Sequence, residues 1–286
     1  MSFLSHITRL VKDPPPAYVF ELSEAGIAYA QNGNTGFEPL PEGALRASPL
    51  EDNLVRPEAP AQLLQRIAPP NGARKLRPAA LILPDYAARV SVLDFDSFPP
   101  TPEEQASLVR FRVKKTVPFD IDSAAVSYWA QPAGGSSKKI EVTAVTVAFE
   151  ILARYEALLR NANFHPGEIT TASLAALNLC HEDGVAVLAK LAGNVLTAAV
   201  MSGGRLKLFR CLMLEEASDE EILAILYPTF AYVEDELGQQ VRKLIVCGFP
   251  HVPAGLKVDV EPLRSRFGTP SAFNAGLLGY LEGAAN

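Results

Sequence analysis

Three consecutive apolar segments between Gly184 and Leu214 constrain the fold of this chain more than any other feature of its sequence. The segments cover residues 185–191, 195–201 and 206–212, and short stretches that contain glycine separate them. The first two segments include several β-branched residues. Because apolar runs of this length divided by glycine turns are typical of hairpins, we expect an antiparallel β-meander here.

The start of the chain has the same pattern. Residues 18–40 read as strand, turn, strand, turn and strand, and Gln31-Asn32-Gly33-Asn34 is a strong hairpin signal. Two meanders of the same kind, one early and one late, predict two halves of similar architecture.

Between the meanders lies a stretch that alternates strand and helix patterns. Thr101 can cap a helix in which Pro102 takes the first position and Glu104 completes a capping box. The other expected elements are strands at 89–95, 124–130 and 140–147 and a helix at 149–162. We therefore expect an inserted subdomain over residues 85–170. The flanking parts are then a first domain over 1–84, a second domain over 171–270, and a last helix over 271–286 that returns to the first domain.

Composition and charge exclude several classes of protein. The net charge of −6 argues against a nucleic-acid-binding protein, whose surface would be basic. There is no run of about 18 apolar residues, and the N-terminus lacks the apolar core of a signal peptide, so we expect a cytoplasmic chain. The first dozen residues have the spacing of a short amphipathic helix. The four histidines lack the spacing of metal ligands, and we expect no metal site.

The order and spacing of these segments resemble the family of the type IV pilus assembly protein PilM. The resemblance rests on a strand followed by a Pro-x-x-Glu-Glu-type helix start, on VPFDIDSAAVSYW at 117–129, on the strand, helix and turn pattern of residues 140–178, and on NAGLLGYL at 274–281. It implies an α/β fold with two actin-like (ribonuclease H-like) domains and an inserted small α+β subdomain.

Actin-like ATPases hold MgATP with two glycine-rich phosphate turns and an adenosine turn, and this chain departs from the family pattern at all three. In the first turn, Glu21 keeps the acid, but Ser23 stands in place of the glycine that lets the backbone approach a phosphate. Glu24 adds a charge of the wrong sign, and Ala28 stands where the family has lysine.

The other two turns differ in charge and in backbone freedom. Lys190 and Ala192 stand where the family has Asp and Gly, just before Gly193, and Gly248 and Phe249 stand in place of a glycine triplet. Neither meander contains Asp-x-Gly, so a different register does not restore the pattern. The resemblance therefore implies a degenerate nucleotide site with no catalytic residue, no ATP hydrolysis and no required cofactor.

The family resemblance also implies a function. In the family, PilM captures the short cytoplasmic tail of a membrane-spanning partner, PilN. We therefore expect a non-catalytic scaffold of the inner-membrane platform of a type IV pilus or type II secretion system, peripheral to the inner membrane through its partners and without a small-molecule substrate. The family's peptide groove suggests Phe98, Pro99, Pro118 and Phe119 as partner-binding residues.

Two further possibilities follow from the sequence. The alternative to a scaffold is an active actin-like ATPase or sugar-kinase-like enzyme with an atypical site, which would require ATP and Mg²⁺. A separate expectation concerns Arg110, Arg112, Lys114 and Lys115, which form a basic cluster in an acidic chain. Such a cluster is ordinarily a solvated helix face, but it could also lie against anionic lipid.

Overall fold

The computed structural model describes residues 16–31, 33–69, 75–132, 139–181 and 184–285. The chain divides into two compact units. Unit 1 contains residues 1–88, 149–179 and 264–286, and unit 2 contains residues 89–148 and 180–263. The amphipathic helix expected in the first dozen residues lies outside the described residues. No described helix is long and apolar enough to span a membrane.

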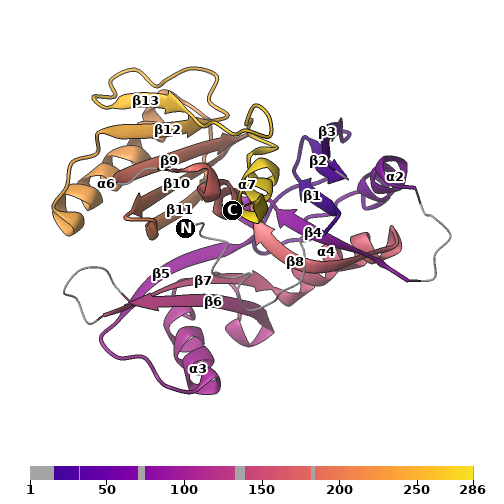
Figure 1. The fold of residues 1–286 in the computed structure, drawn as a ribbon, viewed down its shortest axis with the longest axis horizontal. Helices are drawn as coiled ribbons and strands as arrows, with labels where there is room; N and C mark the ends of the chain where they lie inside the picture. Colours follow the sequence, from indigo (N-terminus) through magenta and orange to yellow (C-terminus); the bar gives the residue numbers. More distant parts are fainter. Residues whose placement is uncertain (1–15, 32, 70–74, 133–138, 182–183, 286) are drawn as a thin grey trace. The chain divides into compact units, whose positions relative to one another are not determined.

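Unit 1 is built on a sheet with the strand order β3-β2-β1-β4-β8 (Figure 1). The first meander forms β1 to β3 as antiparallel neighbours. β4 then pairs in parallel with β1, and β8 pairs in parallel with β4. The strands are β1 (Tyr18–Leu22), β2 (Gly26–Gln31), β3 (Asn34–Pro39), β4 (Arg77–Leu83) and β8 (Phe164–Thr171). The helices are α2 (Glu58–Ile67), α4 (Phe149–Asn161), α5 (Ala172–Ala176) and α7 (Ala275–Ala285), with 3-10 turns η1 (Asp85–Ala87) and η3 (Leu177–Leu179).

Strand β1 is buried on both faces of the sheet of unit 1. Successive side chains of a strand point to opposite sides, so neighbouring residues of β1 pack against different elements. On β1, Val19 joins a core cluster with Ala172 of α5 and Leu277 of α7. The next residue, Phe20, packs edge-on against Phe164, with the ring centroids 4.9 Å apart. β1 and β2 are therefore buried along most of their length, as expected for strands covered on both sides, whereas β3 at the edge of the sheet is largely exposed.

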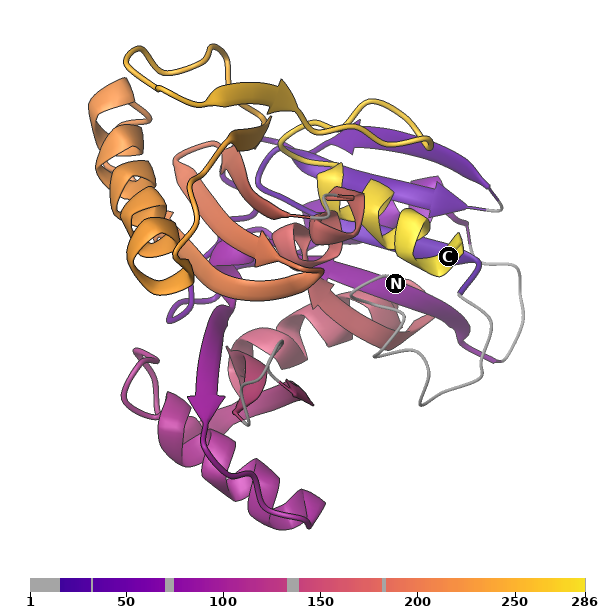
Figure 2. The same cartoon turned by 60° about the vertical axis from the view of Figure 1, so that its left-hand side comes forward.

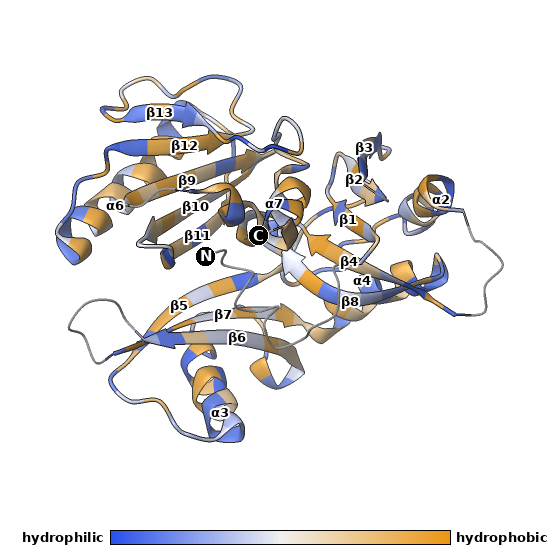
Figure 3. Cartoon of the chain, viewed as in Figure 1, coloured by the Kyte–Doolittle hydropathy of each residue, from blue (hydrophilic) through white to orange (hydrophobic). Residues whose placement is uncertain are grey.

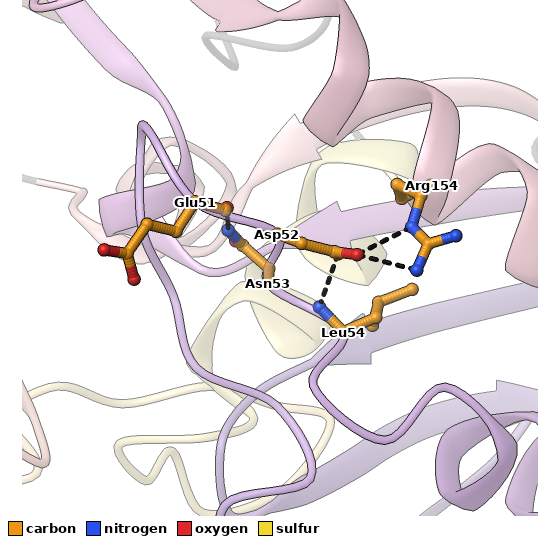
Figure 4. A network of polar contacts seen from close by, with 5 residues as sticks. All are labelled: Glu51, Asp52, Asn53, Leu54 and Arg154. Atoms are coloured by element: carbon orange, nitrogen blue, oxygen red, sulfur yellow. Dashed lines mark hydrogen bonds and ion pairs between the residues drawn. The ribbon is translucent and has the colours of Figure 1, made fainter.

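The segment between β3 and α2 is fastened to α4 by a polar network (Figure 4). The carboxylate of Asp52 accepts hydrogen bonds from the Leu54 N–H at 3.0 Å and from the guanidinium of Arg154, which lies 2.6 Å away at its nearest nitrogen. Below this exposed ion pair, the fully buried Tyr155 hydroxyl donates to the side-chain oxygen of Asn53 at 3.1 Å. The network positions a long connection that has no regular structure of its own.

Unit 2 contains a second sheet whose strand order repeats that of unit 1. The order is β11-β10-β9-β12-β13, again an antiparallel meander followed by two parallel strands. The strands are β9 (Val185–Ala192), β10 (Val195–Ser202), β11 (Arg205–Met213), β12 (Lys243–Cys247) and β13 (Asp259–Pro262). The expectation of two halves with similar architecture is therefore confirmed.

Helix α6 (Asp219–Leu237) packs on the sheet of unit 2, as Figure 2 shows. Ser218 caps it by accepting the backbone N–H of Glu221, which is the hydrogen bond of a Ser-x-x-Glu capping box. Leu226 and Val233 of α6 belong to the same buried cluster as alternate residues of β9. The helix continues through Pro228. Proline has no backbone N–H, so one hydrogen bond of the helix is absent at this residue.

The inserted module of unit 2 is a three-stranded antiparallel sheet with one helix. Its strand order is β5-β7-β6, with β5 (Arg89–Phe95), β6 (Ala124–Pro132) and β7 (Ile140–Ala148), and its helix is α3 (Pro102–Val113), with a 3-10 turn η2 (Ile121–Ser123). Thr101 accepts the N–H of Glu104, as the capping box predicts. Val109 and Val113 of α3 pack against Val142 and Ala144 of β7 to form a separate small core.

The domain boundaries expected from the sequence differ from those of the structure. The module covers residues 89–148 rather than 85–170, because β8 pairs in parallel with β4 and so carries α4 and itself into unit 1. Residues 172–179, expected in the second domain, also belong to unit 1. The last helix starts at Ala275 instead of near Ser271 and, as residues 264–286, lies in unit 1.

Candidate functional site

The first of the three expected nucleotide turns is the tight connection between β1 and β2. The N–H of Ser23 donates to the carbonyl oxygen of Gly26 at 2.9 Å, and the Gly26 N–H donates back to Ser23. The hydroxyl of Ser23 also donates to the Gly26 oxygen at 2.9 Å. Glu24 accepts the Ala47 N–H at 2.9 Å, which ties the turn to the following segment. The N–H groups of Ser23 and Gly26 are therefore both paired within the turn.

Glu21, the retained acid, accepts a hydrogen bond from the N-terminus of α7. Its side chain is buried at the end of β1, and its Oε2 accepts the N–H of Leu277 at 2.6 Å. Leu277 is the third residue of α7, so its N–H is one of the donors that a helix leaves unpaired at its N-terminus. A carboxylate at this place is favoured by the hydrogen bond and by the helix dipole.

A second buried carboxylate, which the sequence reasoning did not identify, has the same role one strand further along the sheet. Asp85 follows β4 and accepts both the N–H and the hydroxyl of Ser173, each at 2.6 Å, at the start of α5. At the end of the next strand, the buried Oγ1 of Thr171 has no hydrogen-bond partner in the described part of the chain. An aspartate directly after a buried strand was a signal for Asp85, but its partner lies 88 residues away.

These groups lie at the carboxyl ends of β1, β4 and β8, which are parallel neighbours. In open α/β sheets, ligands bind beside this edge. In unit 1, however, the carboxylates of Glu21 and Asp85 accept backbone donors of α7 and α5. At this edge, the two acids therefore contact the first turns of α7 and α5.

The second expected turn, in unit 2, joins β9 to β10. Lys190 is buried on β9, opposite Thr197 of β10 and Cys247 of β12. Ala192 pairs with Val195, so the reversal has two central residues, the first of which is Gly193 with a positive φ of 58°. Asn194 is tied to the segment after β11, since its carbonyl oxygen accepts the Leu214 N–H at 2.8 Å. The structure thus shows an ordinary hairpin turn, with a cation on the strand where the family pattern has an acid.

The third expected turn follows β12. Gly248 takes a positive φ of 78°, as a tight exit from the strand requires, and the ring of Phe249 packs against the core of unit 2. Two residues on, the loop is held to the start of α6 by Asp219, which accepts from Ala254 N–H at 3.0 Å and contacts His251 at 2.9 Å. The Ala254 hydrogen bond is the main cause that lowers the pKa of Asp219; burial opposes it, and the hydrogen bond and charge of His251 add smaller lowering effects.

The seven expected site residues therefore divide between the units. Glu21 and Ser23 belong to unit 1, whereas Lys190, Ala192, Gly193, Gly248 and Phe249 belong to unit 2. In unit 1 the turn between Ser23 and Gly26 is held by its own hydrogen bonds, and in unit 2 the ring of Phe249 packs against the core. No group of histidine, cysteine and acidic residues suited to a metal ion occurs in the described ranges.

The four residues suggested for partner binding all lie on the inserted module, at the two ends of α3. Phe98 packs against Phe95 and Tyr128, with ring centroids 5.3 and 6.3 Å away, and Pro99 accepts a hydrogen bond from Gln105. On the other side of α3, Pro118 is exposed. Phe119, like Phe98, is partly buried against the module core. Their role in binding stays a prediction.

The basic cluster of α3 is only partly a solvated face. Arg110 reaches inward and donates to the carbonyl oxygens of Ile121 and Ala124 at 2.8 and 3.1 Å. The guanidinium of Arg112 lies 5.1 Å from the ring centroid of Phe95. Lys114 and Lys115 are exposed. The expectation that all four charges are solvated is wrong for Arg110, because an arginine side chain is long enough to cap carbonyls of a neighbouring turn.

Comparisons with known proteins find solved structures that are similar to this one. No protein-family model matches the sequence, and no curated protein matches it. A chain of the PilM-PilN type IV pilus biogenesis complex matches the structure with a TM-score of 0.69 at 16% identity, covering 95% of this chain and 99% of that chain. Cyto-EpsL, the cytoplasmic domain of EpsL, an inner-membrane component of the type II secretion system of Vibrio cholerae, matches with a TM-score of 0.55 at 13% identity, covering 92% and 94%.

Both matches extend over nearly the whole of either chain, so they concern the complete arrangement of sheets and not a shared fragment. Together with the repeated strand order, they confirm the fold class expected from the sequence. The chain has the two-domain actin-like α/β fold, with a small α+β module inserted in it, and its fold is similar to those of a chain of the PilM-PilN complex and of Cyto-EpsL.

Proposed function

We propose that this chain is a non-catalytic cytoplasmic scaffold of the inner-membrane platform of a type IV pilus or type II secretion system. In this role it binds the short cytoplasmic tail of a PilN-like membrane partner, and this partner holds it at the periphery of the inner membrane. It requires neither ATP nor a metal ion.

The observation that carries the proposal is the use of Glu21. In an active actin-like site, an acid at this position would serve the metal of MgATP, but here its carboxylate holds the N-terminus of α7 at 2.6 Å. A hydrogen bond to a charged group contributes about 1.5–3 kcal/mol, and a buried group left unpaired costs about as much again. A nucleotide that recruited Glu21 would have to offset this loss and also open the turn formed by Ser23 and Gly26.

The likeness to a chain of the PilM-PilN complex supports the choice of partner. It covers 95% of this chain, and so includes the inserted module as well as both sheets. The second match, to a cytoplasmic domain of an inner-membrane secretion component, supports the same cellular setting. A fold retained over the whole chain while its nucleotide turns are closed is what a protein used for its surfaces would have.

The test is a binding measurement with the cytoplasmic tail of a single-span, PilN-like protein encoded beside this chain. A fluorescently labelled tail peptide should show saturable anisotropy changes with the full chain. Pro118→Asp changes an exposed residue of the suggested surface, and Pro132→Asp makes the same change at an exposed residue of β6 as the matched control.

The expected result is that Pro118→Asp weakens tail binding about tenfold or more, equal to about 1.4 kcal/mol, while Pro132→Asp leaves it within about twofold. Absence of any saturable binding by the wild-type chain would contradict the proposed function. Equal loss in both variants would place the tail elsewhere on the molecule.

A further inference from the structure

Unit 2 contains a groove of about 1020 Å³ that the expected nucleotide and tail-binding residues do not line. Its walls are β5 and Glu141 of β7 on one side and β11 with the end of α6 on the other. Strands β5 and β11 lie close to one another (Figure 1). The groove therefore lies between the inserted module and the second sheet, inside a single compact unit.

The lining residues show that the groove follows the edges of strands. Every residue from Val90 to Asp94 of β5 lines it, and so do Lys207, Leu208 and Phe209 of β11. Because successive side chains of a strand point to opposite faces, a cavity over one face would contact alternate residues only. A cavity lined by consecutive residues runs along the backbone edge.

Both edges are open to pairing in the described part of the chain. β5 pairs with β7 alone, and β11 pairs with β10 alone. The outer edge of such a strand presents a row of N–H and C=O groups that can accept another strand. Added strands of this kind are a common way to bind extended peptides.

Two buried polar atoms of opposite kind in the groove lining have no hydrogen-bond partner among the residues that the structure describes. They are Nη1 of Arg205, a donor, and Oε2 of Glu141, an acceptor. The other oxygen of Glu141 is bound by Lys207, and the side chains of this ion pair are only 11% and 17% exposed. A peptide group carries one acceptor and one donor, which are the hydrogen-bonding partners that these two atoms lack.

The charges around the groove favour a partner without a strong net charge. Its acids are Asp94, Glu141 and Glu236, and its bases are Lys139, Arg205 and Lys207, which balance in number. The hydroxyl of Tyr232 lies within this set and donates to the backbone oxygen of Lys207 at 3.0 Å. Burial, and then the nearby carboxylates, raise the pKa of Tyr232, so its proton stays in place at neutral pH. Polyanions and polycations each meet repulsion here, whereas a neutral backbone does not.

We propose that this groove binds an extended peptide segment of a protein partner, of balanced charge, which pairs with the free edge of β5 as an additional strand. The segment's peptide groups bond to Arg205 and Glu141. This is a binding surface beyond the proposed function, because Phe98, Pro99, Pro118 and Phe119 are not among the lining residues.

The experiment uses a phage-displayed library of random linear peptides of about twelve residues, selected on the full chain. Peptides that are enriched are then measured by anisotropy against the wild type, Arg205→Met and Glu141→Gln. Arg66→Met, at an exposed position of α2 in unit 1, is the matched control. Each peptide is also made with alternate backbone nitrogens methylated, which removes the donors needed for strand pairing without changing the side chains.

The expected result is enrichment of peptides whose affinity falls at least about tenfold with Arg205→Met or Glu141→Gln, and is unchanged with Arg66→Met. Methylation should abolish binding, and hydrogen exchange should slow in β5 when the peptide is bound. Three outcomes would overturn the proposal: no enriched peptide, equal binding by the groove variants, or full binding of the methylated peptides. The methylated peptides keep the test decisive even if a groove variant fails to fold.

Discussion

Replacing Gly279 with alanine should loosen the C-terminal helix of unit 1. A Cβ at this position would lie 2.2 Å from the carbonyl oxygen of Ala175, 2.6 Å from its carbonyl carbon and 2.7 Å from the Cα of Ala176. All three atoms belong to the backbone, so no side-chain rotation can relieve the overlap. The two segments would have to separate, and the contact of Glu21 with Leu277 would be strained with them.

Two effects of this substitution oppose each other. Alanine is favoured over glycine in a helix by about 1 kcal/mol. Overpacking a well-filled site costs about 1–3 kcal/mol, and three backbone overlaps below 3.0 Å place Gly279 at the upper end of that range. We therefore expect a net loss of about 2 kcal/mol in the free energy of unfolding of unit 1.

Urea unfolding followed by circular dichroism measures this loss, and hydrogen exchange in α7 shows whether that helix is the part released. The control is Gly167→Ala in the exposed part of β8, where a Cβ has nothing within 4 Å. It should stay within about 0.5 kcal/mol of the wild type, as surface substitutions usually do. If Gly279→Ala unfolds at the same urea concentration as Gly167→Ala, the close packing of α7 on α5 is not as described.

Two further predictions concern the network that fastens the connection before α2 to α4. Tyr155→Phe removes a buried hydroxyl and leaves the side-chain oxygen of Asn53 without that donor, so thermal unfolding should show a loss of about 1–2 kcal/mol. Burial by itself would raise the pKa of Asp52 above 3.8. The hydrogen bond and charge of Arg154, together with the hydrogen bond from the Leu54 N–H, outweigh burial and lower this pKa. The stabilising contribution of Asp52 is therefore present above pH 3.8 and lost as the pH falls through the lower folded pKa. Because the pair is about half exposed, Asp52→Asn should remove less than about 1 kcal/mol at pH 7 and almost nothing near pH 2, measured by urea unfolding at both pH values.

Local signals predicted much of the fold. Both meanders and the cap at Thr101 follow from residues within a few positions of each other, and the structure confirms them. The assignment of β8 required a pairing between Arg77 and Phe164, which no local pattern reveals. β13 was not anticipated because its exposed residues carry no apolar alternation, and the strand is mostly hydrophilic in Figure 3.

The candidate site divides in the same way. The substitutions at Ser23 and Ala192 can be read directly from the sequence, because the loss of a glycine or an acid is visible in a motif. The structural partner of Glu21 cannot be predicted from the sequence in this way, because Leu277 lies 256 residues further along the chain. The inward course of Arg110 was missed for a similar reason, because a helical pattern does not show which carbonyls a long side chain can reach.

The measurement that tests the account most directly is isothermal titration of the full chain with ATP, with and without Mg²⁺. We expect no magnesium-dependent binding up to about 1 mM ATP, corresponding to a binding free energy weaker than about −4 kcal/mol. Circular dichroism first verifies that the wild-type chain is folded. A phosphate-release assay on the same sample then measures ATP hydrolysis. Saturable, magnesium-dependent binding with a Kd near 10 μM or tighter, accompanied by phosphate release, would contradict a closed nucleotide site and establish an active ATPase.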